Sequence, residues 1–307
     1  MPAWNRRTFL TTTPTNLGEL LRRYQASPEA RAAAPTSKVK RAQAFDITIR
    51  YFGGALTLAA IEKRDFRSKL YDWRDSYADR PHAANDYIKH LNTVLNWAVD
   101  RGYMRDNPAA GLKKLKTASR ADIIWTPHHI KALREVAEPA VLQVFDIGRW
   151  TGLRLSDILA LRAFQFEDGW LSVTPRKTVK LGIRLSLPYY LLPPLGDVVT
   201  QLLRIEWLPQ TQVLRNLVGG PWLISNYEKK LNLAKAKAGL SGEDLHFHDL
   251  RGTLVTALLE AGCTEAETGS ISGHGLAHGN MRSYAARTRP LAESAYRKLA
   301  EYIGHGL

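Results

Sequence analysis

The chain has 307 residues, 45% of them hydrophobic, and a formal net charge of +14. This length favours two domains, and the cationic excess favours a polyanionic partner, either nucleic acid or an anionic membrane surface. No apolar run approaches the roughly 20 residues of a spanning helix, and no signal-peptide core follows the N-terminal arginines. The single cysteine, Cys263, excludes an internal disulfide, so we expect a cytoplasmic protein.

Helical periodicity dominates the first third of the chain. Asn16 and Glu19 have the spacing of a capping box, and apolar residues then recur at helical intervals until Pro28, which is expected to end that helix. The periodicity predicts further helices over residues 37–52, 66–73 and 84–98. We therefore predict a four-helix domain over residues 1–112, with basic outward faces that carry Arg64, Arg67, Lys69, Arg74 and Lys89.

The rest of the chain predicts a mixed domain behind a linker. Residues 113–122 are polar and basic without apolar periodicity, which is typical of a linker or of a solvated loop. If the polyanionic partner is a nucleic acid, a linker here would let the two domains close round a duplex. Two short alternating runs within 171–188 flank a basic turn and predict a β-hairpin. Helices are predicted over residues 127–137, 140–150, 228–239, 249–261 and 291–303. The expected fold is mainly α, with a small β-hairpin or sheet in an α+β second domain over residues 123–307.

Several nucleotide and metal motifs are missing from the sequence. It contains no G-x-x-x-x-G-K-[ST] phosphate loop, no H-E-x-x-H and no cysteine pair with zinc spacing. An acidic cluster for two-metal chemistry remains open among the 29 acids, but none stands out. We therefore expect neither a cofactor nor a bound metal.

Side chains suited to phosphate chemistry concentrate in the second domain. TGLR places an arginine after a Thr-Gly break, the hairpin turn carries a lysine, and FHDLR spaces a histidine and an arginine at i and i+3, on one face of a helix. SGHG and RSYAAR add a histidine and a tyrosine. The candidate catalytic residues are Arg154, Lys177, His248, Arg251, His274 and Tyr284.

In their order and long gaps, these motifs resemble those of the tyrosine recombinases, the phage-integrase family. The resemblance covers residues 122–300, and LNTVLNWAVDRGYMRDNPAAGLKK in the first domain is similar to the family's helical core-binding domain. Tyr284 follows His274 by ten residues, one more than the family spacing, so His278 remains an alternative to His274.

The resemblance implies a role for each residue. Tyr284 is the expected nucleophile, and Arg154 and Arg251 are expected to bind the non-bridging phosphate oxygens through paired hydrogen bonds. His248 is the candidate base, and Lys177 is expected to protonate the departing 5′ oxygen. A 3′-phosphotyrosine would retain the bond energy for rejoining, so no ATP is needed. Asp157 and Asp249, beside the arginine motifs, are interpreted as orienting or structural.

Alternatives remain open at this point. Each motif alone is explained by ordinary structure, and Tyr296 and Tyr302 compete with Tyr284. A type IB topoisomerase has nearly the same site, and a non-catalytic DNA-binding relative would keep the fold; the helical first domain favours a recombinase. The expected partners are double-stranded DNA, a tetramer of the chain on DNA, and accessory DNA-bending or directionality proteins, but no membrane. The resemblance implies a bacterial or phage-derived, nucleoid-associated protein.

The C-terminal segment carries an apolar stripe. Pro290 is placed to open a helix, and Leu291, Ala295, Leu299 and either Tyr302 or Ile303 recur at helical spacing. The stripe either packs on its own domain or docks into a neighbouring protomer in a head-to-tail ring.

Overall fold

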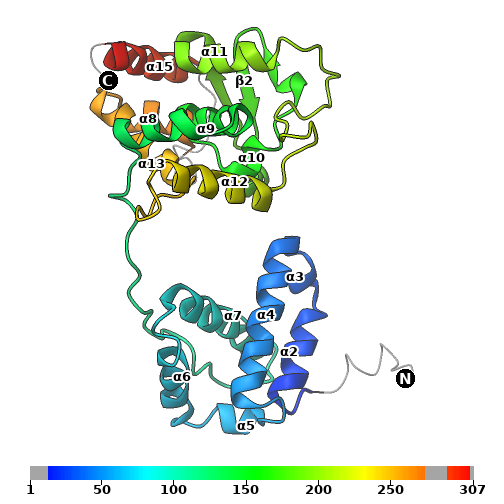
Figure 1. Ribbon diagram of the computed structural model, residues 1–307. Helices are drawn as coiled ribbons and strands as arrows, with labels where there is room; N and C mark the ends of the chain where they lie inside the picture. Colours follow the sequence, from blue (N-terminus) through cyan, green and yellow to red (C-terminus); the bar gives the residue numbers. More distant parts are fainter. Residues whose placement is uncertain (1–12, 274–288, 305–307) are drawn as a thin grey trace. The chain divides into compact units, whose positions relative to one another are not determined.

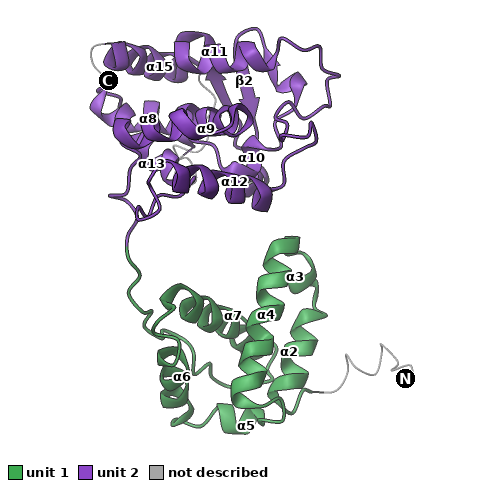
Figure 2. Ribbon diagram, in the orientation of Figure 1, with its two compact units in different colours: residues 1–118 green, residues 119–307 purple. Residues whose placement is uncertain are grey.

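Two compact units make up the chain. A computed structural model describes residues 13–273 and 289–304. The chain divides into residues 1–118 and 119–307, each with its own apolar core (Figure 2). The boundary lies inside the segment predicted as a linker, and residues 119–122 belong to the second unit.

Helices are the regular elements of the described part of the first unit, and residues 101–118 leave it without a helix (Figure 1). Apolar side chains from its longer helices meet in one core, where Leu20, Leu70, Trp73 and Leu95 are almost fully buried. The helices are α2 (Leu17–Gln25), α3 (Pro28–Arg31), α4 (Pro35–Phe52), α5 (Leu58–Ile61), α6 (Phe66–Asp75) and α7 (Pro81–Asp100).

Local chemistry explains where α2 begins and ends. The backbone N–H of Glu19 donates to Asn16 Oδ1 at 2.9 Å, as the predicted cap requires. The carboxylate of Glu19 accepts from the backbone and hydroxyl of Thr15 instead of the Asn16 backbone. The prediction for Pro28 was wrong in one respect. Helix α2 ends at Gln25, and Pro28 opens the short helix α3, because proline suits the first helical position.

Side chains of the first unit hold the segment that leads out of it. Arg67 donates to the carbonyls of Pro108 and Ala110 at 2.8 and 2.7 Å, and Arg74 donates to the carbonyl of Lys113 at 2.6 Å. Asn85 pairs with the backbone of Leu115 in both directions, at 2.9 and 3.0 Å. Two arginines predicted on an outward face, together with Asn85, therefore hold the chain to the first unit as far as Leu115.

The second unit combines helices with a small sheet, which confirms the predicted fold class. Strands β1 (Phe166–Glu167), β2 (Trp170–Val173) and β3 (Leu185–Pro188) form an antiparallel sheet in that order, with Leu171 opposite Leu187. The α-helices are α8 (Pro127–Val136), α9 (Pro139–Thr151), α10 (Leu155–Ile158), α11 (Pro193–Leu202), α12 (Ile224–Lys237), α13 (Asp249–Glu260), α14 (Glu265–Ser272) and α15 (Arg289–Gly304). Three 3₁₀ helices, η1 (Ala163–Gln165), η2 (Arg176–Leu181) and η3 (Tyr189–Leu191), complete the described elements.

Helix α15 packs within its own unit. Ala295, Tyr296 and Leu299 are fully buried in the core of the second unit, and the Tyr296 hydroxyl donates to the carbonyl of Trp150 at 2.8 Å. The part of the apolar stripe that contains Ala295 and Leu299 therefore packs on its own domain, as the first of the two interpretations holds. None of the described helices combines the length and apolar character that crossing a membrane requires.

Candidate active site

The T-G-x-R motif is the end of one helix and the start of the next. Helix α9 ends at Gly152, whose φ of 60° lies in the left-handed region, which glycine adopts without the cost that a side chain adds. Arg154 then stands at the N-cap of α10 and is partly exposed. The chain therefore changes direction after α9, and Arg154 lies between the two helices.

Arg251 lies against this break. Its side chain is 6% exposed, and its Nη1 donates to the Gly152 carbonyl at 2.7 Å. Burial lowers the pKa of Arg251 to about 10, with a further lowering from the nearby charge of Arg154 that Asp157 opposes. The T-G-x-R and H-x-x-R motifs, about a hundred residues apart in sequence, therefore meet at one point.

His248 stands beside these cations at the N-cap of α13. The helix begins at Asp249, as predicted, and the φ and ψ of His248 are already helical, so His248 and Arg251 keep the predicted i and i+3 spacing. Partial burial lowers the pKa of His248 below its usual 6.5, and the charges of Arg251, Arg154 and Lys177 lower it further, against Asp249. The imidazole is therefore neutral at pH 7 and able to accept a proton.

Lys177 approaches from the hairpin. It is exposed on η2, which connects β2 to β3. The adjacent backbone N–H of Arg176 donates to Asp157 Oδ1 at 3.1 Å, which ties the hairpin to α10. The Asp157 side chain is buried, and its Oδ2 has no hydrogen-bond partner among the described residues. Asp157 thus orients the hairpin and supplies a negative charge beside Arg251, in keeping with the role predicted for it.

The structure therefore brings together four of the six candidates: Arg154, Lys177, His248 and Arg251. His274, its alternative His278, and Tyr284 lie outside the described residues. The described chain stops at Gly273, which ends α14 and lies beside Leu185 of β3, and it resumes at Arg289, the first residue of α15.

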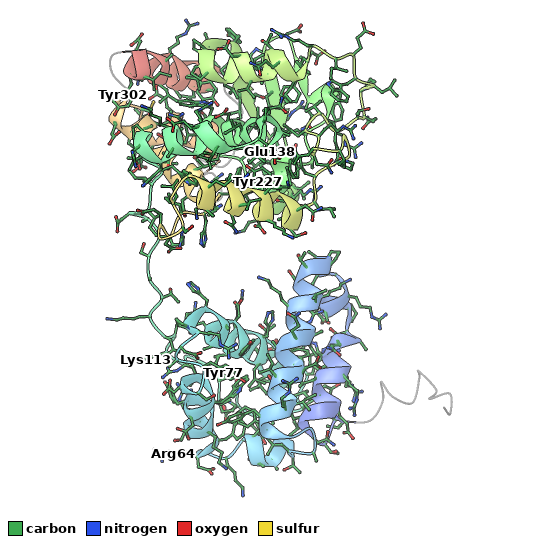
Figure 3. The ribbon with its side chains drawn as sticks, viewed as in Figure 1. Arg64, Tyr77, Lys113, Glu138, Tyr227 and Tyr302 are labelled. Carbon is green, nitrogen blue, oxygen red and sulfur yellow. The ribbon has the colours of Figure 1, made fainter. Side chains whose placement is uncertain are left out.

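Neither competing tyrosine suits a nucleophile. The hydroxyl of Tyr296 is buried and hydrogen-bonded to the carbonyl of Trp150, and burial raises its pKa far above 10. Tyr302 lies at the edge of its unit (Figure 3) and donates to Glu260 Oε2 at 2.8 Å; this hydrogen bond raises the pKa of Tyr302. Both environments disfavour the phenolate, which leaves Tyr284 as the candidate of the three.

Two features beside the site were not predicted from the sequence: the contact that Arg120 makes and helix α14. Arg120, assigned to the linker, contacts Asp249 next to His248. Helix α14, which leads to Gly273, was not predicted because EAETGSIS has no apolar stripe; its capping box of Thr264 and Glu267 was the available signal.

The ring of Phe247, the residue before His248, packs against Gly148 of α9. A methyl group on Gly148 would clash with Cζ of Phe247, and the Phe247 ring packs edge-on against Tyr227 on α12, with 5.5 Å between the ring centroids. Because Phe247 is buried between two helices, it has little room to move.

We expect Gly148→Ala to lower the free energy of unfolding by about 1–3 kcal/mol, the usual cost of overpacking. Urea unfolding measures the loss. Gly252→Ala in α13 is the matched control, because its nearest neighbour beyond the helix lies 4.0 Å away; this change is expected to be neutral or mildly stabilising. Equal stabilities of the two variants would contradict the close contact with Phe247.

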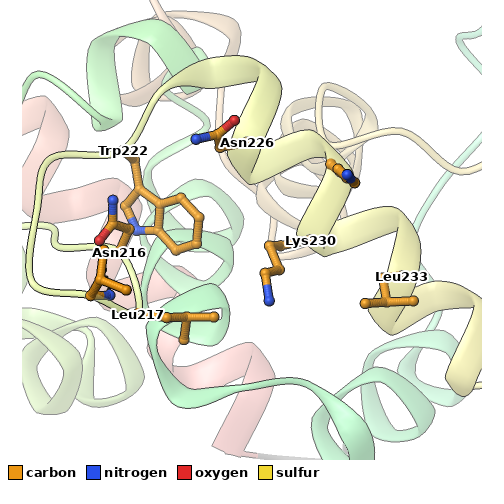
Figure 4. A pocket seen from close by; sticks show the side chains of 8 residues that line it. Asn216, Leu217, Trp222, Asn226, Lys230 and Leu233 are labelled. Atoms are coloured by element: carbon orange, nitrogen blue, oxygen red, sulfur yellow. Dashed lines mark hydrogen bonds between the residues drawn. The ribbon is translucent and has the colours of Figure 1, made fainter.

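A separate pocket lies along α12. It has a volume of about 720 Å³ and is lined by helix residues and by the loop before them (Figure 4). The lining residues are Asn216, Leu217, Val218, Trp222, Asn226, Lys229, Lys230 and Leu233. None of the four assembled candidates belongs to it. Among residues 13–273 and 289–304, no group of three or more His, Cys, Asp or Glu side chains is placed to hold a metal ion.

Several solved structures are similar to the chain over most of its length. The chain is similar to a lambda integrase (residues 75–356) dimer bound to a COC′ core site, with 16% identity, a TM-score of 0.70, and coverage of 85% of this chain and 95% of that one. It is also similar to the Tn1549 transposon integrase in complex with a circular intermediate DNA, with 15% identity, a TM-score of 0.71, and coverage of 85% and 92%. The chain has the integrase fold.

A third structure, a lambda integrase tetramer bound to a Holliday junction, matches with 17% identity, a TM-score of 0.70, and coverage of 89% of this chain and 82% of that one. No protein-family model and no curated protein sequence matches the chain. The integrase fold that the motifs implied is thereby confirmed from backbone similarity alone.

Proposed function

We propose that the chain is a tyrosine-type site-specific DNA recombinase, which cleaves and rejoins DNA through a 3′-phosphotyrosine without metal or ATP. In this proposal the second unit is the catalytic domain, and the helical first unit is a core-binding DNA-binding domain. The integrase fold of both units supports this assignment, since the similar lambda and Tn1549 structures hold DNA.

One observation carries the proposal: the convergence of Arg154, Lys177 and Arg251 around a neutral His248. Holding like charges together, one of them buried, costs free energy in the unliganded protein. Burial, and then the charge of Arg154, lower the pKa of Arg251, which is the direction that this cost predicts. An anion placed between the two guanidinium groups would relieve it, and a phosphodiester presents the paired oxygens that guanidinium groups bind best.

The proposed reaction uses these groups as follows. The Tyr284 oxygen attacks the phosphorus while His248 takes the phenol proton, and the bond to the 5′ oxygen breaks as Lys177 donates a proton to it. Arg154 and Arg251 stabilise the charge that develops on the non-bridging oxygens. Rejoining reverses these steps, with the 5′ hydroxyl displacing Tyr284. His274 would add a further donor to the phosphate.

Recombination joins two duplexes, so we propose that four copies assemble on DNA, one per half-site, with accessory DNA-bending or directionality proteins as further partners. The similar lambda integrase tetramer on a Holliday junction supports this stoichiometry. A nucleoid-associated, cytoplasmic location follows from the same proposal.

The proposal is tested by mapping covalent attachment. The protein is incubated with fragmented bacterial or phage DNA in EDTA and denatured, and the DNA that remains attached to protein is sequenced. We expect attachment through a 3′ phosphate at one or a few sequences, undiminished by EDTA. Loss of attachment in EDTA with recovery in magnesium would contradict the metal-free mechanism. Scattered attachment together with relaxation of a plasmid lacking the mapped sequence would point to a type IB topoisomerase.

A further inference from the structure

The turn that precedes α13 is held by side chains from outside it. Four consecutive backbone carbonyls, from Glu243 to His246, each accept a side-chain hydrogen bond. The buried Lys235 of α12 donates to the carbonyls of residues 243 and 245, at 3.4 and 2.5 Å. The other two carbonyls are bound by Arg120 and Trp125, which lie at the beginning of the second unit.

Arg120 makes the most contacts with this turn. Its Nη2 donates to the carbonyl of Asp244 at 2.6 Å and to Asp249 Oδ2 at 2.7 Å, while its Nε donates to Asp249 Oδ1 at 3.2 Å. Its Nη1 reaches Asp244 Oδ2 at 2.6 Å. The side chain of Asp249 is only 4% exposed, so a single guanidinium group supplies the charge partner of a buried carboxylate.

Trp125 adds a second connection from the same segment. Its indole N–H donates to the carbonyl of His246 at 2.9 Å, and its backbone N–H donates to the hydroxyl of Thr253 at 2.9 Å. That hydroxyl in turn donates to the carbonyl of Asp249 at 2.9 Å. Residues 120–125 therefore contact both the turn that precedes α13 and the beginning of the helix itself.

Asp249 transmits this contact to the candidate active site. Its Oδ2 accepts the backbone N–H of His246 at 2.6 Å, and its own N–H donates to the carbonyl of His246 at 3.1 Å. His248 is its sequence neighbour, and the N–H of Arg251 donates to the carbonyl of His248 at 3.1 Å. A change in the position of Asp249 would thus move two candidate catalytic side chains together.

We propose that Arg120 is a positioning residue: by binding Asp244 and Asp249 it fixes the turn that presents His248 and Arg251 to the scissile phosphate. The inference rests on the proposed recombinase function. Without Arg120, the Asp249 carboxylate would lose its cationic partner while still largely buried, an unfavourable state that the turn would relieve by rearranging. The pKa of Asp249, which Arg120 lowers against the effect of burial, would rise accordingly.

The test compares Arg120→Gln with Arg134→Gln in the full chain. The control removes the same charge from a similar pair, because Arg134 binds the buried Asp146 from a side chain that is 43% exposed, against 36% for Arg120. Hydrogen exchange of the amides of residues 246–251 reports on the turn. Single-turnover cleavage at saturating protein reports on the chemistry, and half-site binding reports separately on affinity.

We expect Arg120→Gln to speed exchange at residues 246–251 and to slow cleavage by up to about a hundredfold, the cost that a misplacement near 1 Å can reach. Half-site affinity should fall no more than it does in Arg134→Gln, and Arg134→Gln should cleave at the wild-type rate. Arg120→Lys keeps the positive charge but loses the paired hydrogen-bond donors of the guanidinium group. Its exchange and cleavage rates should therefore lie between those of the wild type and of Arg120→Gln. Asp249→Asn combined with Arg120→Gln should be no slower than the slower single variant, because both changes break the same contact.

Unchanged exchange at the turn, or wild-type cleavage despite faster exchange, would overturn the inference. Equal slowing in Arg134→Gln would overturn it as well, because the effect would then follow from charge or stability alone. An inactive wild-type protein would instead refute the proposed function, and the exchange measurement would still show whether Arg120 orders the turn.

Discussion

Replacing Tyr284 with phenylalanine is expected to abolish the covalent protein–DNA adduct while leaving DNA affinity unchanged. The variant loses one hydroxyl and keeps the ring, so the nucleophile disappears without a change in charge or shape. The measurement is the amount of labelled DNA that migrates with the protein on a denaturing gel, next to a binding assay on the same DNA.

Tyr302→Phe is the matched control for this experiment. It removes a hydroxyl that donates to Glu260 at 2.8 Å, away from the assembled cations, and should form the adduct at the wild-type rate. An adduct in Tyr284→Phe that is lost in Tyr302→Phe would reverse the assignment of the nucleophile.

Arg251→Ala is expected to slow cleavage by at least about 10²–10³, the usual cost of removing one donor from a developing oxyanion. The cause is the loss of a buried guanidinium group that Arg154 cannot replace from its own position. Single-turnover cleavage measures the effect, and urea unfolding shows whether the variant remains folded.

The free energy of unfolding distinguishes a catalytic role of Arg251 from a structural one. Arg251 is buried beside another cation, so its removal takes away a repulsion as well as the hydrogen bond to Gly152. The free energy of unfolding should therefore fall far less than the activation free energy of cleavage rises. Cleavage within tenfold of wild type in a folded Arg251→Ala variant would contradict the proposed phosphate site.

Much of the site could be predicted from the sequence because its constraints are local. A glycine in the left-handed region ends α9 at Gly152, and the hairpin pattern around Lys177 depends on alternation within each strand. The spacing of His248 and Arg251 needs only one helical turn. Such features depend on a few consecutive residues, and they place all four assembled side chains on recognisable elements.

The remaining features depend on contacts between distant residues. Nothing in LKKLKTASRAD distinguishes Arg120, which binds Asp249 from 129 positions away, from the basic residues near it. The same holds for Arg67 and Arg74, whose carbonyl partners lie about forty residues away. Whether the stripe on α15 packs in its own unit depended on space beside Trp150, which periodicity does not report.

The hydrogen bonds of Asn85 and of Arg120 also set the length of the segment that connects the two units. Asn85 fixes Leu115 to the first unit, and Arg120 is fixed within the second, so only residues 116–119 connect them. That length spans at most about 18 Å when fully extended, at roughly 3.6 Å per residue. In the proposed recombinase, once one unit holds DNA, the other would search a small volume at an effective concentration on the order of millimolar, so its binding would become nearly intramolecular. Residence time on DNA would then depend on the length of these four residues, and an insertion there would shorten it without altering a single contact to DNA.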